Sequence, residues 1–449
     1  MSLVNSGFKL RPHQEEVLNN WEINNYFGFV QHGTASGKTI TGLEAIKRWQ
    51  DSNYYNYSLV AVPTKVLLKQ WIDEINNYFE DVFILVKGGG LDTNNWRGAI
   101  LTFKEKSFFR RYNIILTTYS SLAGNFPLEK IQGKNLLFVA DEAHNLGTME
   151  RKKILEMSCG ANLGLSATPN RFDDEETDKI ISFFKNILHP VYGIGEGIED
   201  GYLSQYNYYV GKVSLTLDEF NDWEERTKSI VRVGQMMENE KNPTVKRDLK
   251  SSLDRQRQER AKIKKSAVNK QYFVRPILEK NYQKGDRWLI YCHDINQLEA
   301  VRESIKDLDI TVLRYVSATN ENISNNLEYF SKVGGVILCC KMLDEGVNVP
   351  KINKGIILAS SQSEREFIQR RGRLLRVADN KYKAEIWDTI VVPPHEQNTS
   401  DSNLMIPEIE RAAVFSQTAK NTTSILNIES IALEYGIDFE NIRQKLETK

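Results

Sequence analysis

The chain has 449 residues, of which 41% are hydrophobic and 26% charged, and these values exclude a disordered chain and indicate several folded domains. Lys+Arg and Asp+Glu both total 59, so the net charge of +0 excludes a basic surface over the whole molecule. No apolar run approaches the roughly 18 residues of a membrane helix, and the first residues lack a signal-peptide pattern, so we expect a cytoplasmic protein without a membrane partner.

Short apolar runs alternate with helix-like segments through the first part of the chain. They cover residues 26–30, 57–63, 82–86, 113–118, 135–144 and 162–169. Strands that are buried on both faces have this continuous apolar character, and their alternation with helices predicts a parallel α/β sheet. We therefore expect a first domain over residues 1–205.

A second series of similar runs predicts a second sheet of the same type. It covers residues 287–294, 310–317, 334–340, 354–360 and 384–391, within an expected domain over 284–395. For the remaining residues, 396–449, the sequence predicts a tail that is polar at first and then helical. The fold class is therefore α/β, with two tandem parallel-sheet domains.

The segment between the two series, residues 206–283, predicts long polar helices and is strongly basic. Residues 241 to 284 contain fourteen Lys/Arg and four Asp/Glu, a local net charge of +10. A solvated helical spacer and an arm that faces nucleic acid both fit this composition.

The stretch "QHGTASGKT" lies between an apolar strand and a helix-like segment. A loop at such a junction directs backbone N–H groups and the helix dipole at one point, which favours a phosphate. Lys38 would reach the β/γ-phosphates and Thr39 would ligate Mg²⁺. The strict phosphate-loop pattern requires glycine five places before Gly37, where this chain has His32.

Two adjacent acids, Asp141 and Glu142, end the apolar run "LLFVADEAH". Acids at the end of a buried strand are costly unless a cation or a reacting water uses them. We assign Asp141 to Mg²⁺ through water and Glu142 to the water that attacks the γ-phosphate. The alternative is that one of them caps a helix.

The segment "SEREFIQRRGRLLR" offers a third group of candidate catalytic residues. If it is helical, Gln369, Arg373 and Arg376 lie on one face and share a target. That target could be the γ-phosphate, which would make the arginines transition-state fingers. A solvated basic helix is the alternative.

The order of motifs over Phe8 to Arg376 resembles that of superfamily 2 helicases and translocases with a DEAH box. The motifs are "FKLRPHQ", "GTASGKT", "VPTKVLLKQW", "TTYSSL", "DEAH", "LSATP", "LIYCHD", "LCCKMLDEGVNVP" and "QRRGRLLR". The resemblance implies two RecA-like domains with ATP and Mg²⁺ between them and a nucleic-acid strand across their upper face.

The resemblance also implies roles for further residues. Nucleotide binding would involve Arg11, Gln14, Gly33, Thr34, Ala35, Ser36, Gly37, Lys38, Thr39 and Gly346. Strand contacts would involve Pro63, Thr64, Thr118, Tyr119, His293 and Ser317. Coupling between the two sites would involve His144, Ser166 and Thr168.

Within the superfamily, the motifs are more similar to those of DNA translocases of repair, recombination and restriction than to RNA-acting DEAD-box proteins. We expect a monomeric ATP hydrolase that acts on single-stranded, duplex or branched DNA and is similar to small phage and bacterial branch-migration helicases. The open alternatives are the motor subunit of a restriction or defence complex, an RNA helicase, and a nucleotide-dependent switch that binds partners without moving a strand.

Overall fold

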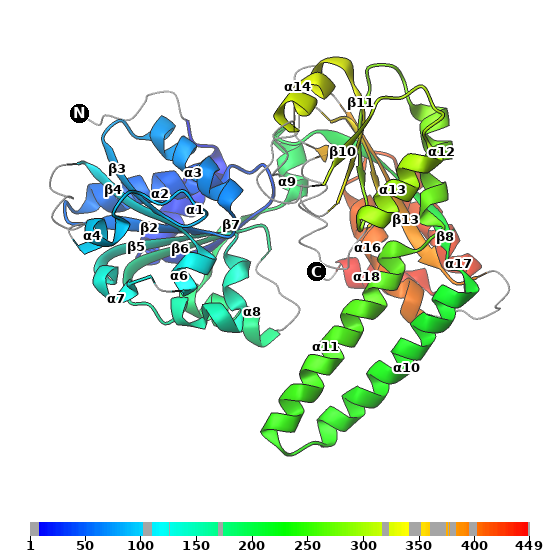
Figure 1. The fold of residues 1–449 in the computed structure, drawn as a ribbon, viewed down its shortest axis with the longest axis horizontal. Coiled ribbons are helices and arrows are strands. Elements are labelled where there is room, and N and C mark those ends of the chain that lie inside the picture. Colours follow the sequence, from blue (N-terminus) through cyan, green and yellow to red (C-terminus); the bar gives the residue numbers. More distant parts are fainter. Residues whose placement is uncertain are drawn as a thin grey trace. The chain divides into compact units, whose positions relative to one another are not determined.

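The computed structural model describes residues 9–101, 110–124, 126–168, 174–316, 323–340, 352–359, 374–375, 377, 383–394 and 402–447 (Figure 1). The chain forms two compact units, of which the first runs to Leu203 and the second begins at Ser204. None of the described helices is long and apolar enough to cross a membrane.

The first unit is built on a seven-stranded sheet in which every recorded strand pair is parallel. The strand order is β3-β4-β2-β5-β6-β1-β7. The strands are β1 (Phe27–His32), β2 (Tyr57–Val62), β3 (Val82–Lys87), β4 (Tyr112–Thr118), β5 (Gly133–Asp141), β6 (Cys159–Ser166) and β7 (Ile187–Tyr192).

Helices cover both faces of this sheet, as its continuous apolar strands require. The helices are α1 (Pro12–Ile23), α2 (Lys38–Ser52), α3 (Lys65–Tyr78), α4 (Trp96–Leu101), α6 (Tyr119–Ala123), α7 (Leu128–Ile131), α8 (Asp174–Phe184) and α9 (Ile194–Glu199), with 3₁₀ turns η2 (Ala143–Gly147) and η3 (Met149–Ile154). Alternate residues of one strand enter different cores: Val60 packs with α1, α2 and α3, whereas Leu59 packs with α4, α6 and α8.

The second unit has a six-stranded sheet, also paired in parallel, in the order β10-β11-β9-β12-β13-β8. Its strands are β8 (Gln205–Ser214), β9 (Arg287–Tyr291), β10 (Val312–Tyr315), β11 (Gly335–Cys339), β12 (Lys354–Ile357) and β13 (Lys383–Val392). Its helices are α10 (Leu217–Asn239), α11 (Pro243–Ser266), α12 (Lys270–Asn281), α13 (Ile295–Ser304), α14 (Ile323–Val333), α16 (Ser402–Gln417), α17 (Thr423–Glu434) and α18 (Phe439–Glu447).

The predicted fold class of two parallel-sheet α/β domains is confirmed by these two sheets. Two strands were not expected, β7 and β8, and each lies at an edge of its sheet. Apart from Gln205, β8 also lies inside the range 206–283 that the sequence assigned to helices. The residues of β8 alternate between buried and more exposed positions, so this strand lacks the continuous apolar run by which the expected strands were recognised.

The long helices α10 and α11 form an antiparallel hairpin that extends away from the second sheet (Figure 1). Near its base, the Arg260 guanidinium lies 5.4 Å from the centre of the Trp223 ring, and Arg226 pairs with Glu259. The Lys264 Nζ donates a hydrogen bond to Glu408 of α16 over 3.0 Å. The hairpin is therefore fixed to the C-terminal tail through a buried ion pair.

The tail also covers the free edge of β8. The Asn421 side chain accepts a hydrogen bond from the Tyr208 backbone N–H and donates one to the Tyr208 carbonyl, both over 2.8 Å. The Asn427 side chain donates to the Val210 carbonyl over 2.7 Å. These amides occupy backbone groups that an edge strand would otherwise expose to another chain.

Candidate nucleotide and nucleic-acid site

The predicted phosphate loop and acidic pair meet at one edge of the first sheet. Because β1, β6 and β5 are parallel neighbours, their carboxyl ends lie side by side. The register places Gln31 opposite Ser166, and Asp141 opposite Leu165. The loop after β1, the acids after β5 and Ser166 at the end of β6 therefore share one edge, where α/β proteins commonly bind ligands.

The loop between β1 and α2 adopts a conformation that needs small residues. Ala35 and Gly37 have φ of +66° and +85°, in the left-handed region. A Cβ on Gly37 would lie 2.5 Å from Gln14 Nε2, so a larger residue there would displace the Gln14 amide. Lys38 begins α2, and its Nζ donates to the carbonyls of His32 and Gly33 over 3.1 and 3.2 Å.

The predicted nucleotide-binding residues of α1 contact this loop directly. Gln14 Nε2 donates to the Gly37 carbonyl over 2.9 Å, and Gln14 Oε1 accepts from the Arg11 backbone N–H over 2.9 Å. Arg11 Nη1 donates to the Ala35 carbonyl over 2.8 Å. These hydrogen bonds thus hold the start of α1 against a loop that lies more than twenty positions later in the chain.

His32, at the position where the strict pattern has glycine, is fully buried. Its Nε2 lies 3.1 Å from the Pro190 carbonyl, and its ring contacts that of His13, with centroids 5.2 Å apart. Burial and the nearby His13 lower the pKa of His32 to about 3, so this imidazole is neutral at physiological pH. His32 therefore packs beneath the loop as a neutral ring.

Asp141 is buried, and both carboxylate oxygens accept hydrogen bonds. Trp71 Nε1 donates to Oδ2 over 2.8 Å, and the Glu142 backbone N–H donates to Oδ1 over 2.9 Å. Burial raises the pKa of Asp141, although the Trp71 hydrogen bond and the Lys38 charge act in the opposite direction. A nearby divalent cation would favour the ionised form, so this carboxylate fits a magnesium site.

The predicted coupling residues form one hydrogen-bonded group. His144 Nδ1 lies 2.7 Å from Ser166 Oγ and 3.4 Å from Glu142 Oε2. Ser166 Oγ donates to the Thr168 carbonyl over 2.8 Å. The structure thus connects the acidic pair of β5 to the end of β6 through a buried imidazole.

The predicted strand-contact residues differ in how much of their side chains is available. Thr64 and Thr118 cap α3 and α6, and each hydroxyl accepts a backbone N–H over 3.3 Å. Tyr119 is fully buried and donates to the Asp141 carbonyl over 2.6 Å, which leaves only its backbone for a strand contact. Pro63 follows β2 and His293 follows β9, each at the carboxyl edge of its sheet.

Several predicted residues lie outside the described part of the chain. They are Gln369, Arg373 and Arg376, with Gly346 and Ser317. Conversely, no role was predicted from the sequence for Trp71, Tyr192 or Tyr202. Trp71 lies within "VPTKVLLKQW", but the contact of its indole with Asp141 depends on the packing of α3 against β5.

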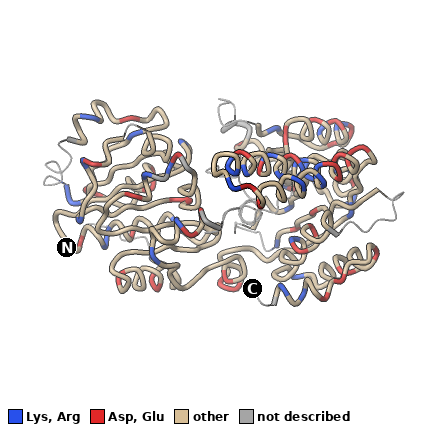
Figure 2. Tube along the Cα trace, turned by 90° about the horizontal axis from the view of Figure 1, so that it is seen from below, with Lys and Arg blue, Asp and Glu red and all other residues tan. Residues whose placement is uncertain are grey.

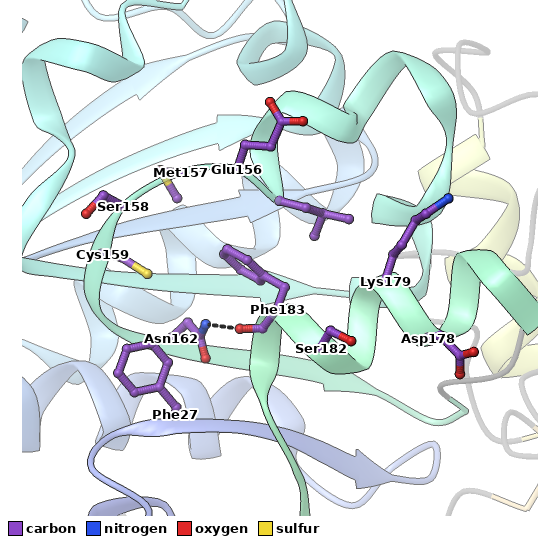
Figure 3. Close-up of a pocket in the computed structure, with 11 residues that line it drawn as sticks. Phe27, Glu156, Met157, Ser158, Cys159, Asn162, Asp178, Lys179, Ser182 and Phe183 are labelled. Carbon is purple, nitrogen blue, oxygen red and sulfur yellow. Dashed lines mark hydrogen bonds between the residues drawn. The ribbon is translucent and has the colours of Figure 1, made fainter.

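A separate cavity lies at the opposite, amino-terminal edge of the first sheet (Figure 3). It has a volume of about 680 Å³, and its lining includes Phe27 at the start of β1 and Cys159 at the start of β6. Asn162 donates to the Phe183 carbonyl over 2.8 Å and accepts from the Gly28 N–H over 3.3 Å. Asn162 therefore has a structural role in joining β1, β6 and the end of α8.

Comparison with known proteins agrees with this architecture. Residues 7–171 match the model for "Type III restriction enzyme, res subunit", and residues 269–378 match the "Helicase conserved C-terminal domain". The chain belongs to helicase superfamily 2. This helicase is 25% identical over 399 residues to the DNA 3'-5' translocase XPB2 of Sulfurisphaera tokodaii, covering 84% of its own length and 81% of the relative's.

Two solved structures share the fold of this helicase. The ATP-dependent Type ISP restriction-modification enzyme LlaBIII, solved bound to DNA, has a TM-score of 0.59 and 17% identity, covering 91% of this chain and 30% of that one. The Pyrococcus furiosus Hef helicase domain has a TM-score of 0.50 and 15% identity, covering 85% of this chain and 95% of that one. The helicase therefore spans most of the Hef domain but less than a third of the restriction enzyme.

Proposed function

We propose that this helicase uses ATP hydrolysis to move along or remodel DNA, with branched or duplex DNA as substrate. The observation that carries the proposal is the meeting of the Lys38 loop and the Asp141–Glu142 pair at neighbouring strand ends. An anion-binding loop beside a buried Asp141 and a half-buried Glu142 suits phosphoryl transfer to water.

The donor set fits ATP and Mg²⁺. The loop residues Gly33 to Gly37 precede the amino end of the fifteen-residue helix α2, which favours a phosphate. The Thr34 hydroxyl is buried and has no hydrogen-bond partner among the described residues, as expected of a loop that holds a ligand. When bound, Mg²⁺ would neutralise charge on the phosphates, and Thr39 and Asp141 are the residues that would hold it.

The chain's own groups would then share the work of hydrolysis. Lys38 would exchange its carbonyl contacts for phosphate oxygens, and Glu142 would orient and deprotonate the attacking water. His144, beside Glu142 and Ser166, would transmit the state of the site to the end of β6. Gln369, Arg373 and Arg376 remain proposed contributors to phosphate binding and turnover, and Gly346 a proposed coupling residue.

The α10–α11 hairpin is a proposed contact surface for the DNA backbone. The α11 segment carries nine Lys/Arg against three Asp/Glu, and Figure 2 marks these charges along the trace. Lys246 and Arg247 are exposed and have no ion-pair partner among the described residues. Unpaired cations along one helix suit a regular array of phosphates without reading base sequence.

The choice of DNA over RNA rests on the translocase relative, which is named for DNA, and on the DNA-bound restriction enzyme that shares the fold. A role in recombination, repair and branch migration is a finer proposal that rests on motif resemblance. The restriction-subunit model over residues 7–171 supports a second candidate, the motor of a restriction or defence complex.

The test is a panel of single-stranded, duplex, forked and four-way DNA, together with RNA, scored for ATPase stimulation and for strand separation. We expect the greatest stimulation with branched or duplex DNA and none in Lys38→Ala. Stimulation by RNA alone would contradict the DNA proposal. Background turnover with every polymer would favour a binding switch, and stable co-purification with a nuclease subunit would favour the restriction motor.

The hairpin assignment has its own test. Lys246→Ala/Arg247→Ala should weaken DNA binding and reduce the slope of log affinity against log salt by about two, one for each lost phosphate contact. The matched control is Lys306→Ala/Lys332→Ala, because these exposed lysines pair with Glu303 and Glu328 elsewhere in the second unit. An unchanged salt slope in the hairpin variant would assign α10 and α11 to a spacer.

A further inference from the structure

Arg11 is held on two sides in the first unit. Its Nη1 donates to the Ala35 carbonyl of the phosphate loop over 2.8 Å. Its guanidinium carbon lies 3.9 Å from the centre of the Tyr202 ring, a stacking distance. Tyr202 comes from the far end of the unit, two residues before Ser204 opens the second unit.

Tyr202 is itself carried by a well-connected segment. The Leu203 N–H donates to the Gly197 carbonyl over 2.7 Å, and Tyr192 Oη donates to Asp200 over 2.8 Å. The Tyr192 ring stacks on that of His13, with centroids 3.7 Å apart and planes 16° apart. The Tyr202 ring therefore has a fixed position relative to α1 and the loop.

The side chain of Gln14, another predicted nucleotide-binding residue, already makes hydrogen bonds within the protein. Its Oε1 accepts from the Arg11 N–H, and its Nε2 donates to the Gly37 carbonyl and lies 3.4 Å from Thr41 Oγ1. Its amide therefore has limited capacity to read a base edge. The Arg11 guanidinium is planar, and Tyr202 stacks on one of its two faces.

We propose that Tyr202 is a specificity-determining residue that holds the Arg11 guanidinium flat for stacking on the nucleobase of ATP, in a layered order of tyrosine, arginine and base. This inference rests on the proposed ATP-dependent function. Stacking of this kind depends on the planarity and polarisability of the guanidinium, which a lysine cannot supply. Tyr202 acts through Arg11 and is therefore a positioning residue.

The experiment measures KM for ATP and kcat at saturating DNA, together with the inhibition constant of inorganic tripolyphosphate, which has no base. Tyr202→Leu should raise KM for ATP about three- to tenfold, the size of a cation–π contact, with kcat nearly unchanged. The inhibition constant of tripolyphosphate should stay the same. Tyr202→Phe keeps the ring and should restore the wild-type KM.

Two further variants keep the test decisive. Arg11→Lys retains the charge but loses the plane, so it should raise KM similarly, and adding Tyr202→Leu to it should have little further effect. Tyr55→Ala, an exposed tyrosine between α2 and β2, is the matched control and should leave KM unchanged. Thermal melting shows whether each variant folds. If Tyr202→Leu fails to fold, the KM of Arg11→Lys for ATP provides the test instead.

The inference is overturned if Tyr202→Leu leaves KM for ATP unchanged, or if it raises the tripolyphosphate constant by the same factor. The second result would mean that Tyr202 merely supports the loop. A wild-type chain that hydrolyses no ATP with any polymer would contradict the proposed function instead. A normally active enzyme with silent Tyr202 variants would contradict this inference alone.

Discussion

Glu142 follows the end of β5 with a left-handed backbone, at φ +48°. This conformation is uncommon for a residue other than glycine and recurs at functional sites. It lets the Glu142 backbone N–H close onto Asp141 while its carboxylate approaches His144, 3.4 Å away. The sequence also allowed Glu142 to cap a helix. Its side chain makes no capping hydrogen bond, so this alternative does not apply to Glu142.

Glu142→Gln should retain ATP binding and lower kcat by at least about 100-fold, since the amide cannot take a proton from water. Single-turnover hydrolysis and equilibrium binding of labelled ATP measure the two effects separately. Glu129→Gln, on the exposed surface of α7, is the control. Near-normal turnover in Glu142→Gln would remove this residue from the catalytic assignment.

Gly37 combines a left-handed backbone with a close approach of Gln14. Gly37→Ala should raise KM for ATP more than tenfold, because the new Cβ would displace the Gln14 amide and strain the loop. Gly90→Ala is the control, since Gly90 has a similar φ of +72° and its Cβ would meet no atom closer than Lys65 Nζ at 3.8 Å. Both variants should lose stability by about 1 kcal/mol, but only Gly37→Ala should alter KM.

At the scale of elements, a buried charge cluster joins the hairpin, the tail and the second sheet. Lys264 of α11 and Arg411 both pair with Glu408 of α16, and Arg411 also pairs with Asp388 of β13. Burial would raise the pKa of Glu408, but the Lys264, Arg411 and Lys270 charges outweigh it and lower the pKa to about 2. Removal of the Glu408 carboxylate would leave the buried Lys264 ammonium without this ion pair, whereas Arg411 would keep its pair with Asp388.

Glu408→Gln should destabilise the second unit by about 3 kcal/mol at neutral pH. Because the folded pKa of Glu408 lies below its usual 4.5, the wild-type stabilisation is complete above pH 4.5 and is lost as pH falls towards 2. Chemical unfolding between pH 7 and 3 measures this difference. If wild type and variant lose stability equally as the pH falls, the ion-pair account is wrong.

The sequence was most informative for elements that are buried on both sides. Eleven of the strands, β1 to β6 and β9 to β13, follow continuous apolar runs, with small shifts in their ends. β7 contains Pro190 and β8 has half of its pattern polar, and both features are tolerated at sheet edges. Hydrophobic runs therefore identify every central strand of the two described sheets, but only two of the four edge strands, β3 and β10.

At the scale of the whole molecule, two compact units with separate cores predict two unfolding transitions. A non-hydrolysable ATP analogue at about 100 times its Kd should stabilise the unit that carries the phosphate loop by about 2.7 kcal/mol. Glu408→Gln should lower the other transition. Differential scanning calorimetry tests both effects, and one transition that responds to both changes would show that the units unfold together.

The sequence predicted some parts of the candidate site and missed others. The Lys38 loop and the Asp141–Glu142 pair were recognisable because each motif is local and its chemistry is distinctive. The contacts of Trp71 with Asp141 and of Tyr202 with Arg11 join segments that are distant in sequence, so no local pattern contains them. Those partners depend on how α3 and the segment after α9 pack.

The covered edge of β8 has a consequence for biosynthesis. This strand is the first of its unit to leave the ribosome, yet its sheet partner β13 is the last strand made, and the amides of Asn421 and Asn427 follow later still. A nascent chain must therefore carry the edge of β8 without its hydrogen-bond partners until β13 and then Asn427 have been made, while the described strands of the preceding sheet are already complete. If translation stopped before the tail, the released protein would expose the backbone groups of the tyrosine-rich edge strand β8. These groups could then pair with the same edge of another copy.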